Sequence, residues 1–207
     1  MRFAVLVSGS GTNLQAMLDA AARGALTPAR LALVVSNVPG VLALDRAAAA
    51  GLPTRCLDHR GFASRTAFEE ALLATLRDHQ IEAVALAGFM RLLGPPLLDA
   101  FPGRVINIHP SLLPAFPGLH AQRQALAHGV KIAGCTVHFV DPGTDSGPII
   151  AQAAVPVLDD DDEATLGARI LGEEHRLYPQ VMRWLAEERL ERRGRQVTLR
   201  PDRPPAG

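Results

Sequence analysis

The first half of the chain alternates short, continuous apolar runs with longer stretches in which apolar residues recur every three or four positions. A strand covered on both faces is apolar throughout, whereas an amphipathic helix repeats its apolar residues with a period near 3.6. Strands are expected over residues 3–7, 31–35, 53–57, 83–87 and 104–108. Helices are expected along the face marked by Leu14, Met17, Leu18 and Ala21, through 41–50, and from about Ser64 to Arg77.

The second half of the chain has a different pattern. Strand-like runs over 132–139 and 149–157 are joined by a loop rich in Gly and Pro, which predicts a mixed or antiparallel extension of the sheet. The acidic residues 159–163 lead into a long amphipathic helix that reaches about Glu188, since carboxylates stabilise a helix N-terminus. A last short strand is expected over 196–199, followed by a fraying end.

This order of elements predicts an α/β protein with a Rossmann-like, doubly wound and mostly parallel sheet, helices on both faces and a mixed or antiparallel C-terminal extension. The length of 207 residues suits a single domain over 1–207, in which residues 191–207 form a tail. A net charge of zero, with 48% hydrophobic and 20% charged residues, is typical of an ordinary globular protein. It argues against a surface built for nucleic acid or membrane.

The two cysteines, Cys56 and Cys135, are far apart in the sequence, and both are expected to be buried, reduced thiols. The N-terminal segment does not fit a signal peptide, and no apolar run reaches membrane-spanning length, so a cytoplasmic location is expected. The histidines do not show the spacing of a zinc site. Although His138 lies near the loop over 141–147, no metal is expected.

Asn107 and His109 lie at the end of a predicted strand, where alternation places both side chains on one face. Ligands of parallel sheets bind at the carboxyl ends of the strands, so this is a favourable place for a site. An amide and an imidazole on one face can polarise a single carbonyl group. Asp145, on the Gly- and Pro-rich loop, could hold the imidazole and support its protonated form. This combination predicts acyl transfer without a covalent nucleophile.

Three other features leave alternatives open. The loop Ser8–Asn13 is either a tight turn in which Thr12 or Asn13 caps a helix, or a cradle of N–H groups for a phosphate. Arg91, which follows a strand, either caps a helix or binds a ligand carboxylate. Glu174 falls on the apolar stripe of the long helix, where a lone carboxylate is costly to bury. Its partner is either a protein arginine or an amine-bearing substrate.

Five segments together carry a specific pattern. They are Ser8–Gln15, Ala87–Leu93, Asn107–Pro114, Gly134–Val140 and Glu174–Pro179. With these segments the chain resembles the glycinamide ribonucleotide formyltransferases, folate-dependent enzymes of purine synthesis, from Arg2 to about Leu190. The resemblance implies a phosphate- and nucleotide-binding half over 1–100 and a catalytic and folate-binding half over 101–190. It also implies small-molecule substrates and a monomer or homodimer.

The resemblance further assigns roles to individual residues. Glycinamide ribonucleotide would be bound by Gly11, Thr12, Asn13, Leu171, Gly172, Glu173 and Glu174. The co-substrate 10-formyltetrahydrofolate would be bound by Arg65, Met90, Arg91, Leu92, Leu93, Asn107, Asp141, Pro142, Gly143, Thr144 and Asp145. Catalysis would depend on Asn107, His109 and Asp145. Similar proteins often carry glutamine where Leu171 stands, so a side-chain hydrogen bond to the substrate is not expected there.

The mechanism that the resemblance implies is direct transfer. The glycinamide amine attacks the formyl carbon and produces a tetrahedral oxyanion. Asn107 donates a hydrogen bond to that oxygen, while protonated His109 stabilises it and helps to deliver a proton to N10 of the folate.

Two related folate enzymes are alternatives, because methionyl-tRNA formyltransferase and formyltetrahydrofolate hydrolase resemble the same Asn-x-His and Ser-Leu-Leu-Pro core. The tRNA enzyme carries a further C-terminal nucleic-acid-binding domain, and the hydrolase carries an N-terminal regulatory domain. Here a short tail follows the long helix, the first strand begins at residue 3, and the loop over 8–13 is expected in neither relative. A non-catalytic folate- or nucleotide-binding protein would lack a catalytic group, and all three are present.

Overall fold

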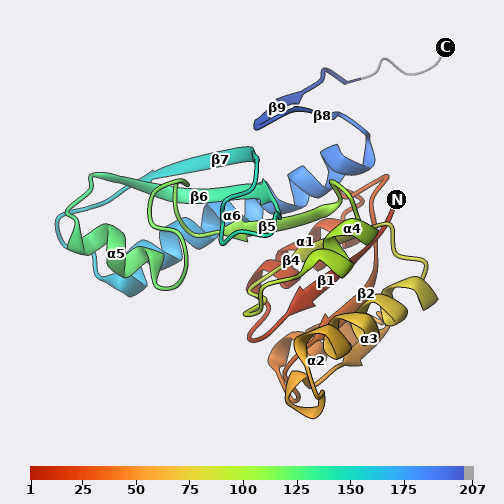
Figure 1. The fold of residues 1–207 in the computed structure, drawn as a ribbon. Helices are drawn as coiled ribbons and strands as arrows, with labels where there is room; N and C mark the ends of the chain where they lie inside the picture. The colour runs from red at the N-terminus through yellow and green to blue at the C-terminus, as the bar shows by residue number, and fades with distance from the viewer. Residues whose placement is uncertain (203–207) are drawn as a thin grey trace.

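The structure, a computed structural model, describes residues 1–202. Its main sheet has seven strands in the order β3-β2-β1-β4-β5-β6-β7, and a separate two-stranded sheet joins β8 to β9 (Figure 1). The strands are β1 (Arg2–Val7), β2 (Arg30–Ser36), β3 (Thr54–Cys56), β4 (Ala83–Leu86), β5 (Val105–His109), β6 (Ile132–Phe139), β7 (Ile149–Pro156), β8 (Leu190–Arg193) and β9 (Gln196–Leu199). The helices are α1 (Thr12–Ala22), α2 (Leu42–Ala49), α3 (Arg65–Asp78), α4 (Pro95–Ala100), α5 (Ala121–Ala127) and α6 (Glu163–Ala186), with a 3₁₀ turn η1 (His59–Gly61).

Different helices cover the two faces of the sheet. Along β1, Phe3, Val5 and Val7 pack in one core with residues of α1, α2 and α6. Ala4 and Leu6 point the other way and pack in a second core with residues of α3 and α4. This division follows from the alternation of side chains along a strand. Strands β1 to β5 pair in parallel and β6 and β7 pair antiparallel, so the expected doubly wound α/β fold with a mixed extension is confirmed.

The predicted elements are confirmed to within one or two residues at their ends, where assignments commonly differ. The sequence pattern does not predict α4 and α5, because six and seven residues are too few to show a helical period. It also misses β8, which is the partner of the expected strand over 196–199. The expected fraying end falls partly on residues 203–207, which lie outside the described residues.

The expectation that both thiols are buried is wrong for one of them. Cys135 is buried in β6, whereas Cys56 is exposed. Cys56 is the last residue of β3, which is a three-residue strand at the edge of the sheet. An edge strand has a neighbour on one side alone, so its end is open to solvent.

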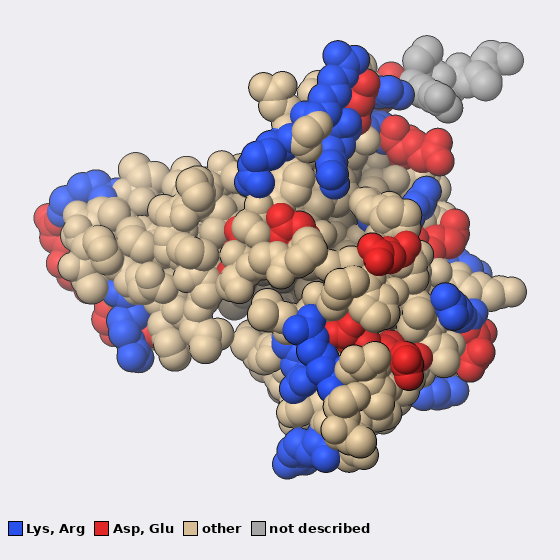
Figure 2. Space-filling model, in the orientation of Figure 1, with Lys and Arg blue, Asp and Glu red and all other residues tan. Residues whose placement is uncertain are grey.

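Charged side chains of both signs are interspersed over the face shown in Figure 2. Basic side chains gather over the β8–β9 hairpin at the top of this view. Two of them, Arg193 and Arg200, pair with Glu191, which offsets part of the local charge. Among residues 1–202, no helix combines the length and the apolar character that crossing a membrane requires.

Tyr178, on α6, contacts the backbone of the neighbouring strands β4 and β5. Its side chain is fully buried, and its hydroxyl lies 2.8 Å from the carbonyl oxygen of Leu86 and 3.0 Å from that of Ile106. Tyr178→Phe should leave both carbonyls without this donor and lower the free energy of unfolding by about 1–2 kcal/mol. Urea unfolding of both proteins measures the difference. Equal stability of the two proteins would show that the hydroxyl contributes nothing to holding β4 and β5.

Candidate functional site

The end of β5 carries two of the candidate catalytic side chains. Asn107 and His109 are two residues apart in this strand, and such residues share a face. His109 is buried, whereas Asn107 is half-buried. β4 lies on one side of β5 and β6 lies on the other. Figure 2 shows the surface hollowed between the extension formed by β6, β7 and α5 and the half that carries α2 and α3.

Asp145 reaches this strand end from the loop between β6 and β7. Its Oδ2 lies 3.3 Å from Nδ1 of His109 and accepts a hydrogen bond of 2.8 Å from the Gly118 N–H. Its Oδ1 lies 3.4 Å from Nδ2 of Asn107. The structure therefore brings the three candidate catalytic side chains together, although 38 residues separate Asn107 from Asp145.

The backbone of Asp145 is strained. Its φ of 50° lies in the left-handed region, which non-glycine residues adopt at a cost of the order of 1–3 kcal/mol. The surrounding contacts of the carboxylate hold the residue in this conformation. Because aspartate tolerates the left-handed region better than most residues, the contacts of the carboxylate, and not this φ, are the evidence for a role.

His138 is a further member of the site that the sequence pattern does not single out. It lies opposite Asn107 in the antiparallel register of β5 and β6, and its side chain is buried. Its Nδ1 lies 2.9 Å from the carbonyl oxygen of Phe139, so the N–H sits on that nitrogen. Nε2 is then free to accept a hydrogen bond of 3.2 Å from Nδ2 of Asn107. His138 and Asp145 together orient the Asn107 amide.

Both ring nitrogens of His109 face acceptors. Nε2 lies 2.9 Å from the carbonyl oxygen of Phe116, and Nδ1 faces the Asp145 carboxylate. A neutral imidazole carries one N–H, so only the protonated ring can donate on both sides. Burial raises the pKa of Asp145, but the hydrogen bond from the Gly118 N–H and the charge of His109 lower it, and the pKa lies below its usual value. The site therefore favours an ionised Asp145 beside the His109 ring.

The loop over residues 8–13 connects β1 to α1. It lines a cavity of about 230 Å³ together with Ala87, Gly88 and Met90 from the end of β4. Gly11 is the N-cap residue of α1, with a φ of 72° and no side-chain hydrogen bond to the helix, so neither Thr12 nor Asn13 is the cap. Uncapped N–H groups at a helix start favour an anion. Of the two alternatives for this loop, the geometry supports a phosphate site formed by N–H groups over a tight turn capped by a side chain.

Glu174 enters the same region from α6. Its carboxylate is buried, and Oε2 accepts a hydrogen bond of 2.7 Å from Nδ2 of Asn13, 161 residues away in sequence. Its partner in the protein is thus an amide, and within residues 1–202 no cationic side chain forms an ion pair with it. Oδ1 of Asn13 is also buried and has no hydrogen-bond donor in the described part of the chain. Both groups can accept further hydrogen bonds from a ligand that carries donors.

Burial raises the pKa of Glu174, and the hydrogen bond from Asn13 offsets part of this effect. A carboxyl group whose pKa is higher in the folded state loses stability as the pH rises through its ordinary value of about 4.3. Glu174→Gln should therefore raise the unfolding midpoint of the free protein at pH 8, and the gain should shrink toward pH 4. Thermal unfolding at both pH values measures this. A lower midpoint at pH 8 would contradict the account of Glu174 as a costly, function-related charge.

Apart from Asn107 in β5, the candidate folate residues lie in two loops and on α3. Met90 and Leu92 are exposed, whereas Leu93 is buried. The Arg91 guanidinium lies 5.5 Å from the centre of the Phe68 ring, so it stacks on an aromatic side chain instead of capping a helix. Arg65 pairs with buried Glu69 at 2.7 Å.

The loop that carries Asp145 is closed by its own contacts. Asp141 accepts hydrogen bonds from the Gly143 N–H at 3.1 Å and from the Ser146 hydroxyl at 2.6 Å. Pro142 and Thr144 are exposed in the same loop. The tip of the β8–β9 hairpin contacts it as well, because Arg195 donates to the Ser146 carbonyl at 2.9 Å.

The remaining substrate candidates lie on α6. Leu171 is half-buried and Gly172 is exposed. The carboxylate of Glu173 pairs with Arg176 at 2.6 Å, so the structure does not join it to the contact between Asn13 and Glu174. In the described part of the chain, no group of three His, Cys, Asp or Glu side chains is arranged so that it could hold a metal ion.

Comparisons with known proteins agree with this geometry. The family described as formyl transferase matches residues 1–182. The phosphoribosylglycinamide formyltransferase of Bacillus subtilis (strain 168) is 45% identical over 89% of this chain and 94% of its own length. The trifunctional purine biosynthetic protein adenosine-3 of Drosophila melanogaster is 51% identical over 89% of this chain, which spans 14% of that protein.

Solved structures give the same result. The crystal structure of glycinamide ribonucleotide transformylase 1 from Symbiobacterium toebii superposes with a TM-score of 0.95 at 55% identity, over 97% of this chain and 94% of that one. The match therefore includes both the sheet and its antiparallel extension. The chain belongs to the formyl transferase family.

Proposed function

We propose that the protein is a phosphoribosylglycinamide formyltransferase. It transfers the formyl group of 10-formyltetrahydrofolate to the amine of N1-(5-phospho-D-ribosyl)glycinamide in purine synthesis, and its family and relatives support this reading. The observation that carries the proposal is the buried pair of Glu174 and Asn13. In this pair a buried carboxylate that has no cationic partner within residues 1–202 is bonded to a residue of the anion-binding loop. A ligand that carries an amine for the carboxylate and a phosphate for the loop fits both.

The substrate binds with its phosphate on the N–H groups around Gly11, Thr12 and Asn13. The Glu174 carboxylate accepts hydrogen bonds from the ribosyl glycinamide part, and Oδ1 of Asn13 accepts one that it lacks within the protein. Leu171 and Gly172 contact this part through their backbone and through packing. Each buried polar group then has a partner, which lowers the cost of holding Glu174 away from water.

The folate binds beside the exposed side chains of Met90 and Leu92, with the loop over 141–145 around its pterin ring. Arg65 and Arg91 supply positive charge for folate carboxylates. The protein acts in the cytoplasm on these small molecules, without nucleic acid or metal, as a monomer or homodimer.

The reaction is a direct transfer. The glycinamide nitrogen attacks the formyl carbon, the new C–N bond forms, and the carbonyl electrons move to the oxygen. Asn107 donates an N–H to that oxyanion in place of its 3.4 Å contact with Asp145. The His109 imidazolium donates to the same oxygen in place of one of its protein acceptors. The C–N10 bond then breaks, His109 gives its proton to N10, and the proton released by the attacking nitrogen restores the imidazolium. Asp145 keeps a negative charge beside the ring throughout.

An acceptor comparison tests this proposal. The protein is given 10-formyltetrahydrofolate with glycinamide ribonucleotide, with charged initiator tRNA, or with water as the sole acceptor. Formation of tetrahydrofolate and of the formylated acceptor is then measured. Rapid transfer to glycinamide ribonucleotide alone is expected. Transfer to the tRNA alone, or hydrolysis alone, would assign the protein to another activity within the family.

A further inference from the structure

We propose that Arg46 is a positioning residue for the anion-binding loop, acting together with the backbone N–H of Ala43. The two groups hold successive carbonyl groups of the loop against α2, and so turn the N–H groups of Ser10 and Gly11 toward the ligand. This inference rests on the proposed function in one respect, namely that the substrate's phosphate binds at the loop.

Two hydrogen bonds define the back of the loop. The Ala43 N–H donates to the Gly9 carbonyl at 3.2 Å. Nε of Arg46 donates to the Ser10 carbonyl at 2.9 Å. Both donors come from α2, which begins at Leu42. Two successive peptide carbonyls of the loop are therefore tied to the same helix.

The orientation of the N–H groups follows from these bonds. In a trans peptide the carbonyl and the following N–H point in opposite directions. A Gly9 carbonyl directed at α2 sends the Ser10 N–H away from α2, and a Ser10 carbonyl directed at Arg46 does the same for the Gly11 N–H. Successive N–H groups on one side of a turn form a concave site for an anion. The cavity lined by residues 8–13 is bounded by this loop.

Close packing leaves the loop little freedom to move toward α2. Gly11 has a φ of 72°, and a Cβ atom built on it would lie 2.6 Å from Cβ of Ala43. Contacts this short do not occur in real proteins, so the approach of loop and helix depends on glycine at this position. Steric contact thus sets the distance between loop and helix, and the two hydrogen bonds set the rotation of the peptides.

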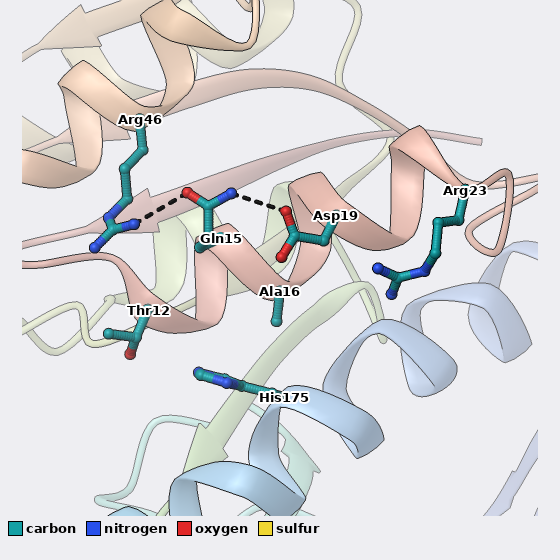
Figure 3. A pocket seen from close by; sticks show the side chains of 7 residues that line it. All are labelled: Thr12, Gln15, Ala16, Asp19, Arg23, Arg46 and His175. Carbon is teal, nitrogen blue, oxygen red and sulfur yellow. Dashed lines mark hydrogen bonds between the residues drawn. The ribbon is translucent and has the colours of Figure 1, made fainter.

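Arg46 has a second anchor, which ties the loop to α1. Nη1 of Arg46 donates to Oε1 of Gln15 at 3.1 Å, and Nε2 of Gln15 donates to Asp19 at 2.9 Å (Figure 3). These side chains line a groove of about 360 Å³ that also includes Thr12 and Arg23. The planar guanidinium makes two bonds in fixed directions, which a flexible ammonium cannot reproduce.

Arg23 offers a matched control for charge. Figure 3 shows Arg23 at the far end of the same groove, where it follows the last residue of α1. It lines the groove with Arg46 but makes no hydrogen bond to residues 8–13 within the described structure. If Arg46 acts only through its positive charge, loss of Arg23 should weaken anion binding to a similar degree. If Arg46 acts by orienting peptides, the two losses should differ.

The test compares Arg46→Gln, Arg46→Lys and Arg23→Gln with the unaltered protein. Titration calorimetry with inorganic phosphate and with ribose 5-phosphate measures anion binding. Steady-state kinetics compare glycinamide ribonucleotide with the same acceptor lacking its phosphate. Thermal unfolding checks that each variant is folded, and Arg46→Lys serves where Arg46→Gln does not fold.

Arg46→Gln is expected to weaken binding of both phosphates about tenfold and to raise KM for the phosphorylated acceptor to a similar degree, with the loss in KM exceeding that in kcat. KM for the acceptor without phosphate should stay within about twofold, Arg46→Lys should recover part of the loss, and Arg23→Gln should change binding less than about twofold.

Three results would overturn the proposal. They are unchanged phosphate binding in Arg46→Gln, an equal loss in Arg23→Gln, and an equal rise in KM for the acceptor without phosphate. The binding measurements do not depend on transfer. The protein could bind phosphate in a way that depends on Arg46 and yet fail to formylate glycinamide ribonucleotide. That result would reject the proposed function but would support the role of Arg46.

Discussion

Asn107→Ala should lower kcat for formyl transfer about a hundred- to a thousandfold, the usual cost of removing one oxyanion donor. The Asn107 amide is half-buried, and its hydrogen bond to His138 Nε2 fixes its orientation. Its second N–H lies 3.4 Å from Asp145 Oδ1 and reaches the oxyanion by giving up that longer contact. Such preorganised donors act mainly on the charge that develops in the transition state. The effect should therefore appear in kcat, with a smaller change in KM for either substrate.

Two measurements accompany this prediction. Folate binding by the variant, followed by fluorescence or calorimetry, should remain within a few-fold of the normal value, and its thermal unfolding should show a folded protein. A folded Asn107→Ala variant that keeps near-normal turnover would remove the proposed role of this amide.

Asp145→Asn should also lower kcat strongly, about a hundredfold or more, because it removes the charge that faces the His109 imidazolium. Asparagine keeps an oxygen that can accept the hydrogen bond from the Gly118 N–H, so the loop geometry can persist. A lower kcat in a variant whose loop is unchanged would therefore be due to the lost charge of Asp145. Steady-state kinetics at neutral pH measure the effect.

Asp141→Asn is the matched variant, since it changes an aspartate of the same loop that does not touch His109. It should raise KM for the folate more than it lowers kcat. If the two variants lost kcat equally, the loop as a whole, and not the Asp145 charge, would be responsible.

Asp145 also gives a pH prediction for stability. Its pKa in the folded protein lies below the ordinary value of about 3.9, so ionised Asp145 stabilises the fold above that value. This stability is lost as the pH falls through the folded pKa. Asp145→Asn should therefore lower the free energy of unfolding at pH 7, and the difference from the unaltered protein should shrink as the pH falls below about 4. Urea unfolding over this range measures it, and a constant difference would contradict the assignment.

Much of the fold could be predicted because its strands are buried on both faces. Continuous apolar runs such as 3–7 and 83–87 have few interpretations other than central strands, and helices between them imply parallel pairing. The helices α4 and α5 could not be predicted, because a segment of one or two turns shows no period. The exposure of Cys56 could not be predicted, because it depends on strand order, and local sequence does not reveal which strand lies at the edge.

The site was predictable where local geometry decides it. Asn107 and His109 share a face because strands alternate, whatever surrounds them. His138 required the antiparallel register that pairs it with Asn107. The contact between Asn13 and Glu174 joins two helices that are far apart in sequence, so it could not be predicted from the spacing of residues along the chain.

The most direct test of the account is a crystal structure with glycinamide ribonucleotide and a folate analogue that cannot transfer its one-carbon group. We expect the phosphate on the N–H side of the loop over 8–13, away from α2. We expect the glycinamide amine to face the folate's one-carbon position, with Asn107 and His109 within about 3–3.5 Å of the reacting atoms. A phosphate bound elsewhere, or a folate whose reacting carbon lies beyond reach of Asn107 and His109, would contradict it.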